Sequence, residues 1–413
     1  MRRLFKLRIS TFLSGRKENY RSFVACRRIR VCCSIMKLFV CTFFVAHAQI
    51  ETSVQVHIPN RGEQSGMVES VLHPFWTESQ MNREPVLFVQ RTGKDSATAR
   101  LLFRADNILS VTREDGGQTF EQGLDYLWNS GSRTLMLTAN SRIPSKTMAE
   151  LHPLKSSPLS FGETADGKTS LFFAEGGAVF HSLQVNVAYQ HRSKWNGYIP
   201  SPASTQLERT INRLRRKDPL RIVVLGDSIS YGACASSMFH EAPYQPPYTE
   251  LVAAALRAKY LSPVSLINLS VNGTVSGWGV TQISAIANEH PDLLVLAFGM
   301  NDASSGVSPV DYSEHIRSIM RDVRKYNPQV DFILVATMTG NPEWAKADQE
   351  LYSQYRRALL RLDGPGVAVA DLTSMWHDIL KEKRFTDLTG NGINHPNDFG
   401  HSVYAQVIVS LLR

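Results

Sequence analysis

Residues 220–230 read LRIVVLGDSIS, an apolar run that stops at Gly226 and is followed at once by Asp227 and Ser228. Further apolar runs follow along the chain, separated by segments with the spacing of amphipathic helices. Continuous apolar strands that alternate with helices are typical of a parallel sheet buried on both faces. The sequence therefore predicts one three-layer α/β domain over 220–413. The predicted strands are 222–225, 264–267, 293–298, 332–336 and 367–370, and the predicted helices are 247–259, 279–289, 310–325, 344–361, 372–383 and 398–412.

Polar residues stand directly after these strands. Ser228 follows the first strand, Gly273 lies beyond the second, and Asn301 follows the third. His395 precedes the last predicted helix. The carboxyl ends of parallel strands meet at one edge, where open α/β sheets place their sites, so we expect these residues to converge. A serine becomes nucleophilic when a neighbouring base accepts its proton, and imidazole titrates near neutrality.

The four blocks, in this order and spacing, resemble the SGNH, or GDSL-like, hydrolase superfamily over residues 220–413. The resemblance implies a flavodoxin-like fold and hydrolysis of an ester through an acyl-enzyme. It implies that Ser228 is the nucleophile and that His395 is the general base and then the general acid. It also implies an oxyanion hole made by the backbone N–H groups of Ser228 and Gly273 and the side-chain amide of Asn301.

One block departs from the family pattern. The family has an aspartate three residues before the histidine, and this chain has Gly392 there. A literal Asp-x-x-His occurs at Asp398 and His401, which makes His401 an alternative base. We favour His395 because proline follows it directly and Gly400 follows five residues on, as is common in the family.

The residue that orients His395 is left open by the sequence. Asp387 and Asn391 are the candidates, and a backbone carbonyl would make the site a Ser–His dyad. Asp371, after the fifth predicted strand, is a more distant candidate.

The chain before this domain shows a different pattern. From about Val54 to Gln190, short β segments are separated by turn dipeptides, which favours a β-sandwich of the jelly-roll kind. We expect its three tryptophans to pack in a core rather than to stack on sugar rings. The predicted strands are 85–89, 99–103, 108–112, 134–138, 170–173 and 183–189, and the tryptophans are Trp76, Trp128 and Trp195. The predicted organisation is a β-sandwich domain over 49–200, a linker over 201–219 with a short helix near 205–217, and the hydrolase domain over 220–413.

The charge of the chain is concentrated at its N-terminus. The formal net charge is +8, and residues 1–48 contain eleven Lys or Arg against one acid, so residues 49–413 carry about −2. This distribution excludes a nucleic-acid partner. Residues 38–45 (LFVCTFFV) are apolar, are followed by Ala46-His47-Ala48, and are too short to span a bilayer. The pattern predicts a signal segment over 1–48, cleaved after Ala48, with translation starting at Met1 or Met36; a basic amphipathic anchor is the alternative.

The sequence predicts neither a metal nor a cofactor. The histidines show no paired ligand spacing and the chain has no Gly-rich phosphate loop. Cys234 is the lone cysteine after residue 48, so an internal disulfide in the mature chain is excluded.

Together these patterns predict a secreted or periplasmic serine esterase that hydrolyses short-chain acyl esters, chiefly acetyl, on carbohydrate. The argument depends on export, on the accessory β domain and on the lack of a long apolar lid segment. The alternatives are a lipase, thioesterase or acyltransferase of the same superfamily, or a catalytically weak polysaccharide-binding protein. The expected partner is an acylated carbohydrate or another small ester, with no nucleic acid and no stable membrane span. The oligomeric state and the role of the β domain stay open.

Overall fold

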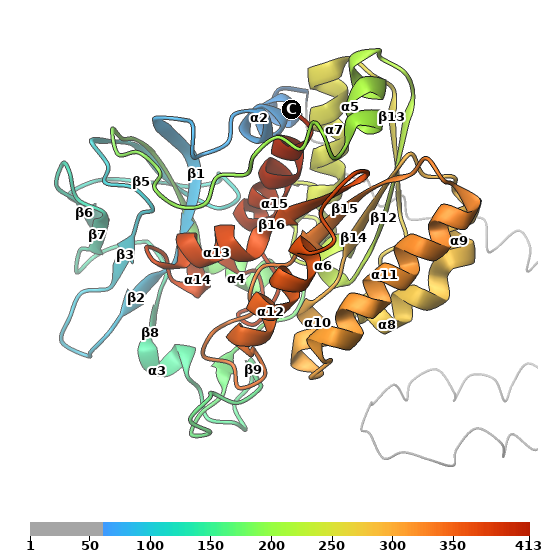
Figure 1. Cartoon of the computed structure of the whole chain (residues 1–413). Helices are drawn as coiled ribbons and strands as arrows, with labels where there is room; N and C mark the ends of the chain where they lie inside the picture. The colour runs from blue at the N-terminus through green and yellow to red at the C-terminus, as the bar shows by residue number, and fades with distance from the viewer. Residues whose placement is uncertain (1–60) are drawn as a thin grey trace, which may run out of the picture. The chain divides into compact units, whose positions relative to one another are not determined.

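A five-stranded parallel sheet carries the C-terminal half of the chain in the computed structural model, which describes residues 61–413 (Figure 1). The strand order is β13-β12-β14-β15-β16, the 2-1-3-4-5 order of flavodoxin-like folds. Every residue of β14, β15 and β16 is buried, as the continuous apolar runs predicted. The predicted α/β domain is therefore confirmed. The strands are β12 (Leu220–Gly226), β13 (Val264–Asn268), β14 (Leu293–Ala297), β15 (Asp331–Ala336) and β16 (Val367–Asp371).

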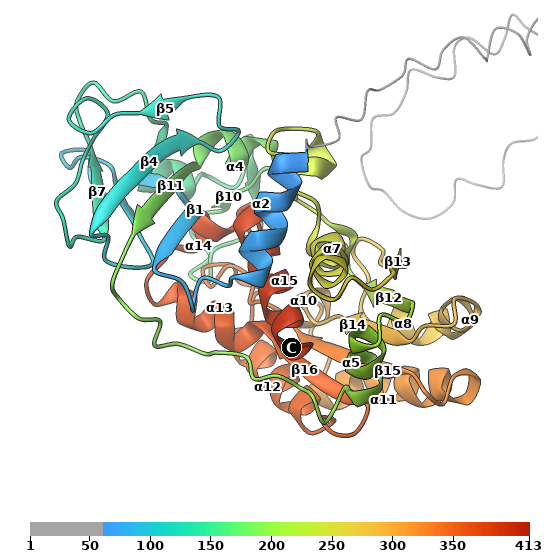
Figure 2. The same cartoon turned by 90° about the horizontal axis from the view of Figure 1, so that it is seen from above.

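Helices cover both faces of this sheet (Figures 1 and 2). The helices α7 (Tyr248–Tyr260) and α15 (Asp398–Leu411) pack together on one face. The other face carries α11 (Pro309–Tyr326) and α12 (Gln349–Leu360). The remaining helices of this half are α5 (Glu208–Arg215), α6 (Ser228–Tyr231), η3 (Ser236–Phe239), α8 (Ser276–Gly279), η4 (Val280–Gln282), α9 (Ile283–Asn288), α10 (Met300–Ser304), α13 (Leu372–Leu380) and α14 (Phe385–Leu388).

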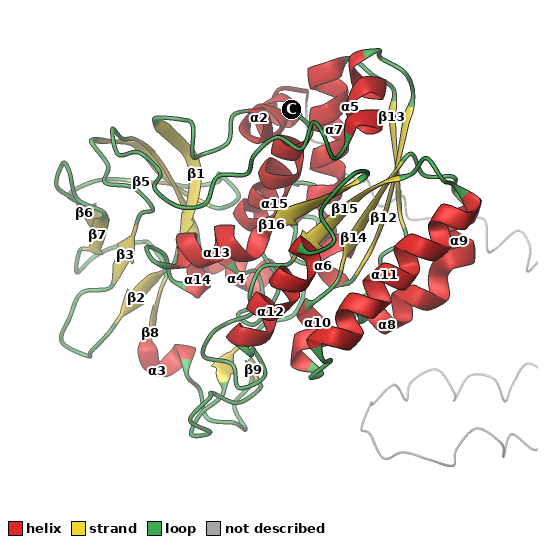
Figure 3. Ribbon diagram, in the orientation of Figure 1, coloured by secondary structure: helices red, strands yellow, loops and turns green. Residues whose placement is uncertain are grey.

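The N-terminal half is rich in sheet, as predicted (Figure 3). One antiparallel sheet has the order β1-β11-β4-β5, and a second sheet has the order β6-β7-β3-β2-β8. The strands are β1 (Gln80–Val86), β2 (Phe88–Gln90), β3 (Thr98–Arg100), β4 (Asn107–Arg113), β5 (Thr119–Phe120), β6 (Tyr126–Leu127), β7 (Thr134–Leu137), β8 (Ser145–Thr147), β9 (Ser160–Phe161), β10 (Leu171–Phe172) and β11 (Val185–Gln190), and the helices are α2 (Arg61–Leu72), α3 (Met148–Leu151) and α4 (Ala178–Leu183). The helix α2 packs on α7 and α15 of the α/β half.

The tryptophans of this half pack in the core. Trp76 is buried, and Trp128 and Trp195 are partly buried against the same cluster. Phe75 makes edge-to-face contacts with Trp76 and Trp195, each with ring centroids 5.1 Å apart. These rings therefore act as the apolar fillers that the sequence suggested.

The described residues form one compact unit, and the sheet-rich and α/β halves share one hydrophobic core. The predicted linker contains α5, whose Ile211 and Leu214 are buried and whose Thr210 donates to Asp331 at the start of β15. The proposed domain limits at 200 and 220 stay a prediction. The predicted signal segment, residues 1–48, lies outside the described residues.

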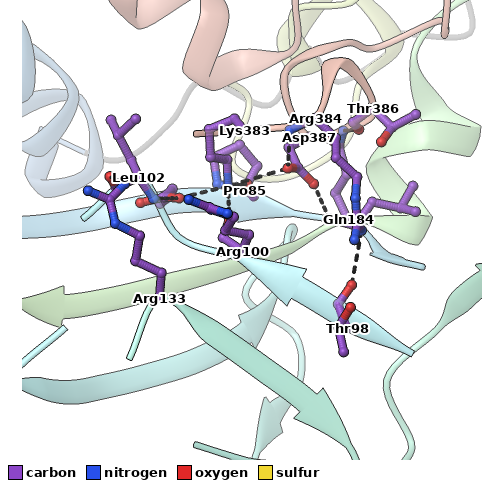
Figure 4. A network of polar contacts seen from close by, with 12 residues as sticks. Pro85, Thr98, Arg100, Leu102, Arg133, Gln184, Lys383, Arg384, Thr386 and Asp387 are labelled. Carbon is purple, nitrogen blue, oxygen red and sulfur yellow. Dashed lines mark hydrogen bonds and ion pairs between the residues drawn. The ribbon is translucent and has the colours of Figure 1, made fainter. Parts of the chain in front are cut away.

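A buried ionic network joins the two halves (Figure 4). The ammonium of Lys383 donates to Glu84 Oε1 at 2.7 Å and to the carbonyls of Pro85 and Arg100 at 3.0 and 2.8 Å. Lys383 and Glu84 are 4% and 0% exposed. Glu84 also accepts from the backbone N–H of Leu102 at 2.8 Å. The two charges therefore pair with each other, and with backbone groups, inside the buried ionic network.

We expect Lys383→Met to lower the free energy of unfolding by about 3–5 kcal/mol, because it leaves Glu84 buried without a counter-charge. Urea unfolding measures the change. Lys168→Met is the matched control, since the Lys168 side chain is 80% exposed beside Asp166, and its effect should stay within about 0.5 kcal/mol. Equal effects of the two substitutions would contradict a structural role for the buried pair.

Candidate active site

Ser228 lies at the carboxyl end of β12 and begins α6. The side chain of Asp227 caps this helix, because its Oδ1 accepts from the backbone N–H of Ile229 at 2.9 Å. Burial raises the pKa of Asp227 to about 7. Ser228 is 5% exposed, so its hydroxyl sits in a nearly closed position at the sheet edge.

His395 meets this serine from the loop between α14 and α15. Its Nε2 lies 2.8 Å from Ser228 Oγ, a hydrogen-bond distance for a nucleophile and its base. The carbonyl of His395 accepts from the backbone N–H of Gly390 at 3.0 Å and from Thr389 Oγ1 at 2.9 Å. These bonds close the loop and hold the imidazole at the serine.

The protonation of His395 is set mainly by burial. Burial, with a smaller contribution from repulsion by His401, lowers the pKa of His395 to about 4. The imidazole is therefore neutral at neutral pH, which is the charge state that a general base requires.

Of the two proposed orienting residues, Asn391 lies at the histidine. Its Nδ2 is 3.0 Å from His395 Nδ1 and 3.0 Å from Asn394 Oδ1. Its Oδ1 accepts from the backbone N–H groups of Ile393, Asn394 and His395 at 3.0, 3.0 and 3.1 Å. The Asn391 side chain is thus fully engaged inside the loop.

Asp387, the other proposed orienting residue, is engaged elsewhere. Its carboxylate accepts from the backbone N–H groups of Leu87 at 2.8 Å and Arg384 at 3.0 Å, and lies 3.6 Å from Lys383 Nζ. Asp387 belongs to the buried ionic network between the two halves and does not contact the histidine.

Asp371 is also engaged away from the site. It caps α13 through Ser374 N at 2.9 Å and binds Arg356 Nε at 2.6 Å.

The alternative base His401 does not meet the serine. It is fully buried on α15, where its Nε2 lies 3.1 Å from the carbonyl of Ala233 and its Nδ1 accepts from the backbone N–H of Tyr248 at 3.4 Å. The carboxylate of Asp398 accepts from the backbone N–H of Ser236 at 2.8 Å. The literal Asp-x-x-His pattern therefore serves the packing of the last helix.

Gly392 explains the departure from the family pattern. Its φ is +89°, and a Cβ there would lie 2.2 Å from the carbonyl oxygen of Phe172 in β10. An aspartate at this position would collide with the backbone of the N-terminal half. The acid is therefore excluded sterically from the place where the family carries it.

The loops after β13 and β14 are tied to the end of β12. The carbonyl of Gly226 accepts from Val271 N at 3.1 Å and from Thr274 Oγ1 at 3.2 Å, and Asn301 Nδ2 donates to the carbonyl of Thr274 at 3.0 Å. Gly273 between them has a φ of +76°, which favours glycine. Three of the predicted site loops are thus linked at Gly226, two residues before Ser228. The side-chain amide of Asn301 has a second hydrogen that this network does not use.

Nothing in the sequence indicated that Cys234 would lie at the histidine. Its Sγ is 3.9 Å from His395 Nδ1, and burial raises the pKa of this thiol to about 12. The group is therefore a neutral thiol, with a weak S–H donor, beside the imidazole. A lone cysteine in a sequence carries no signal of such a contact.

A cavity of about 600 Å³ lies behind the histidine loop. Gly392 and Asn341 line it, whereas Ser228 and His395 do not. Its walls come from both halves of the chain and include Arg91, Met148, Phe172 and Arg384. It is a separate space from the Ser–His contact.

The fold is flavodoxin-like in its strand order, and it brings a serine and a histidine within hydrogen-bond distance near the carboxyl edge of the sheet. Residues 224–403 match the model of the GDSL-like Lipase/Acylhydrolase family, as the four blocks predicted. A thioesterase, protease and lysophospholipase of Escherichia coli is 28% identical over 109 residues, which is 26% of this chain and 47% of that protein. An arylesterase of Vibrio mimicus is 30% identical over 90 residues, 22% of this chain and 41% of that protein.

The chain therefore spans less than half the length of these curated relatives. Among solved structures, a two-domain esterase active on acetylated mannans is similar with 20% identity and a TM-score of 0.40, over 52% of this chain and 54% of that chain.

We expect His395→Ala and His401→Ala to act on different properties. His395→Ala should lower turnover of p-nitrophenyl acetate at least about 50-fold, the further loss seen when the histidine is removed from a triad already lacking its acid. His401→Ala should instead lower the free energy of unfolding by about 1–3 kcal/mol, since it leaves the Ala233 carbonyl and the Tyr248 N–H unpaired. Steady-state kinetics and urea unfolding on both variants test this. The reverse pattern would make His401 the base.

Proposed function

We propose that this chain is an exported serine esterase that removes short acyl groups, chiefly acetyl, from carbohydrate. The observation that carries the proposal is the 2.8 Å contact of Ser228 Oγ with His395 Nε2 at the carboxyl edge of the sheet. The names of the two curated relatives, a thioesterase and an arylesterase, support hydrolysis of an acyl ester.

In the proposed mechanism Ser228 Oγ attacks the ester carbonyl while His395 Nε2 takes its proton. The resulting imidazolium gives that proton to the leaving alcohol, and an acyl-enzyme remains. Water then attacks the acyl-enzyme with His395 again as base, which releases the acid and restores the serine.

The proposed oxyanion hole consists of the backbone N–H groups of Ser228 and Gly273 and the second amide hydrogen of Asn301. Its support is the set of hydrogen bonds that ties the Gly273 and Asn301 loops to Gly226. Donors that are fixed before the reaction stabilise the developing alkoxide without reorganisation, each by about 3–4 kcal/mol.

The substrate class has weaker but specific support. Tyr231 follows Ser228 by three residues, and the backbone N–H of Val271 binds the Gly226 carbonyl. Their side chains are 47% and 46% exposed, so apolar surface is available near the buried serine. Such a surface suits a small acyl group. The sheet-rich N-terminal half contacts the histidine loop. This contact supports the proposal that the alcohol part of the substrate is bulky, as in a polysaccharide.

The alternatives differ in what they would hydrolyse. A lipase would prefer long acyl chains, a thioesterase would prefer acyl thioesters, and an acyltransferase would pass the acyl group to an added alcohol. A polysaccharide-binding protein would turn over none of these. An acyl-length series of p-nitrophenyl esters, an acyl thioester, an added acceptor alcohol and acetate release from acetylated polysaccharides together separate the four.

We expect Ser228→Ala to lower hydrolysis of p-nitrophenyl acetate at least about 10²-fold with little change in thermal stability. Retention of a tenth of the wild-type rate in this variant would exclude Ser228 as the nucleophile.

We expect Asn301→Ala to lower kcat roughly 10²–10³-fold with a smaller effect on KM, because its donor acts on charge that exists mainly in the transition state. A raised KM with unchanged kcat in this variant would make Asn301 a substrate-binding residue.

Export is proposed from the N-terminal sequence alone. None of the helices within residues 61–413 is long and apolar enough to cross a bilayer. We expect the exported protein to begin near Gln49, which N-terminal sequencing of secreted or periplasmic material measures. Recovery of residues 1–48 on membrane-bound protein would favour the amphipathic anchor.

A further inference from the structure

The direction of the hydrogen bonds around Asn391 is fixed by the backbone. Its Oδ1 accepts from three successive N–H groups, those of Ile393, Asn394 and His395. A flipped amide would turn its NH₂ against all three donors. The oxygen therefore faces the loop backbone, and the nitrogen faces the imidazole.

The nitrogen end then determines the tautomer of the histidine. One hydrogen of Asn391 Nδ2 points to Asn394 Oδ1 and the other to His395 Nδ1, each at 3.0 Å. An amide NH₂ only donates, so His395 Nδ1 must accept. A neutral imidazole carries one proton, which consequently lies on Nε2 and points at Ser228 Oγ.

The other neighbour of Nδ1 is compatible with this tautomer. Cys234 Sγ, 3.9 Å from Nδ1, belongs to a neutral thiol, which is a weak donor and a weak acceptor. Its S–H can donate to Nδ1, so the Nε2-protonated tautomer satisfies both contacts, and the amide of Asn391 decides between the tautomers.

We propose that Asn391 is a positioning residue that holds His395 in the Nε2-protonated tautomer and thereby attenuates the Ser228–His395 pair. The inference rests on the proposed esterase function and adds a control on its rate. In the resting site His395 Nε2–H donates to Ser228 Oγ, which is the reverse of the bond that general-base catalysis needs.

Catalysis requires the proton to leave Nε2 and to be carried on Nδ1. Nε2 then takes the proton of Ser228 while the serine oxygen forms its bond to the acyl carbon. The imidazolium gives that proton to the leaving alcohol as the bond between the alcohol oxygen and the acyl carbon breaks. In that tautomer Nδ1–H faces the Nδ2–H of Asn391, two donors with no acceptor between them. Replacing a triad aspartate by asparagine, which imposes the same wrong tautomer, lowers kcat about 10⁴-fold.

Asn391→Asp should therefore raise the activity. One carboxylate oxygen would keep the three backbone donors, an arrangement that favours the ionised form. The other would replace Nδ2 and accept from Nδ1–H, which frees Nε2 to act as base. Position 392, where the family carries its acid, does not offer this route because of the close approach of Phe172.

The experiment compares the full-length chain with its Asn391→Asp variant. We expect kcat for p-nitrophenyl acetate to rise about 10²–10⁴-fold. The acidic limb of kcat/KM should move to higher pH from its wild-type position near pH 4, because a carboxylate favours the imidazolium. In ¹⁵N spectra of ring-labelled histidine, assigned by loss of the signal in His395→Ala, the wild-type proton should lie on Nε2 and the variant proton on Nδ1.

Three controls isolate the effect. Asn394→Asp adds the same charge in the same loop without facing Nδ1, and should change kcat less than about tenfold. Gly392→Asp should destabilise the protein and not raise kcat. Ser228→Ala in the Asn391→Asp background should abolish the gain.

The outcomes separate this inference from the proposed function. A wild-type proton on Nδ1, or a folded Asn391→Asp variant with unchanged kcat beside an active wild type, overturns the inference. If wild type and variant hydrolyse no ester but the wild-type proton lies on Nε2, the proposed function fails and the tautomer assignment stands. If Asn391→Asp does not fold, the wild-type spectrum alone decides the tautomer.

Discussion

The amide oxygen of Asn391 is the fixed point of the proposed site. Three consecutive backbone N–H groups converge on it, and this convergence bends the loop so that His395 faces Ser228 at 2.8 Å. Buried backbone donors must be paired, so the position demands an acceptor. An amide supplies that acceptor, but it also brings a donor, which faces the ring. The same side chain therefore builds the geometry of the pair and biases its protonation in the unfavourable direction.

The N-terminal half accounts for why the loop has this composition. The carbonyl of Phe172 occupies the space that a side chain at Gly392 would need, and Ala174 N donates to the carbonyl of Asn391 at 3.3 Å. Asp387, the nearest carboxylate before the histidine in the sequence, binds the backbone N–H of Leu87. Packing between the halves thus excludes an acid at position 392 and holds Asp387 away from His395. The sheet-rich region is in this sense part of the environment of the histidine loop.

The sequence predicted the strands that consist of continuous apolar runs. The limits of β12 and β14 lie within two residues of those predicted, because buried parallel strands leave a pattern that solvent-facing elements lack. Strands such as β5 and β6, with two residues each, are too short to show a period, and they form only because longer neighbours pair with them.

The site divides in the same way. The convergence of Ser228 with loops after other strands follows from the shared edge of a parallel sheet, so the sequence could indicate it. The steric reason for Gly392 could not be foreseen, since the obstructing carbonyl belongs to a distant segment. The donor or acceptor role of Asn391 depends on the directions of three N–H groups, which a sequence does not record.

The buried ionic network between the two halves explains how the histidine loop keeps its place without a carboxylate beside His395. Lys383 binds Glu84 and two carbonyls of the N-terminal half immediately before α14, and Asn397 Nδ2 binds Gln184 Oε1 at 2.9 Å immediately before α15. The segment that carries His395 is therefore anchored at both ends to the N-terminal half. Buried polar contacts of this kind contribute little net free energy relative to apolar packing, but they are directional. Since apolar contacts would allow the loop to slide, these directional contacts maintain the Ser228–His395 distance, and the choice between Asn and Asp at position 391 can alter the chemistry with little effect on the geometry.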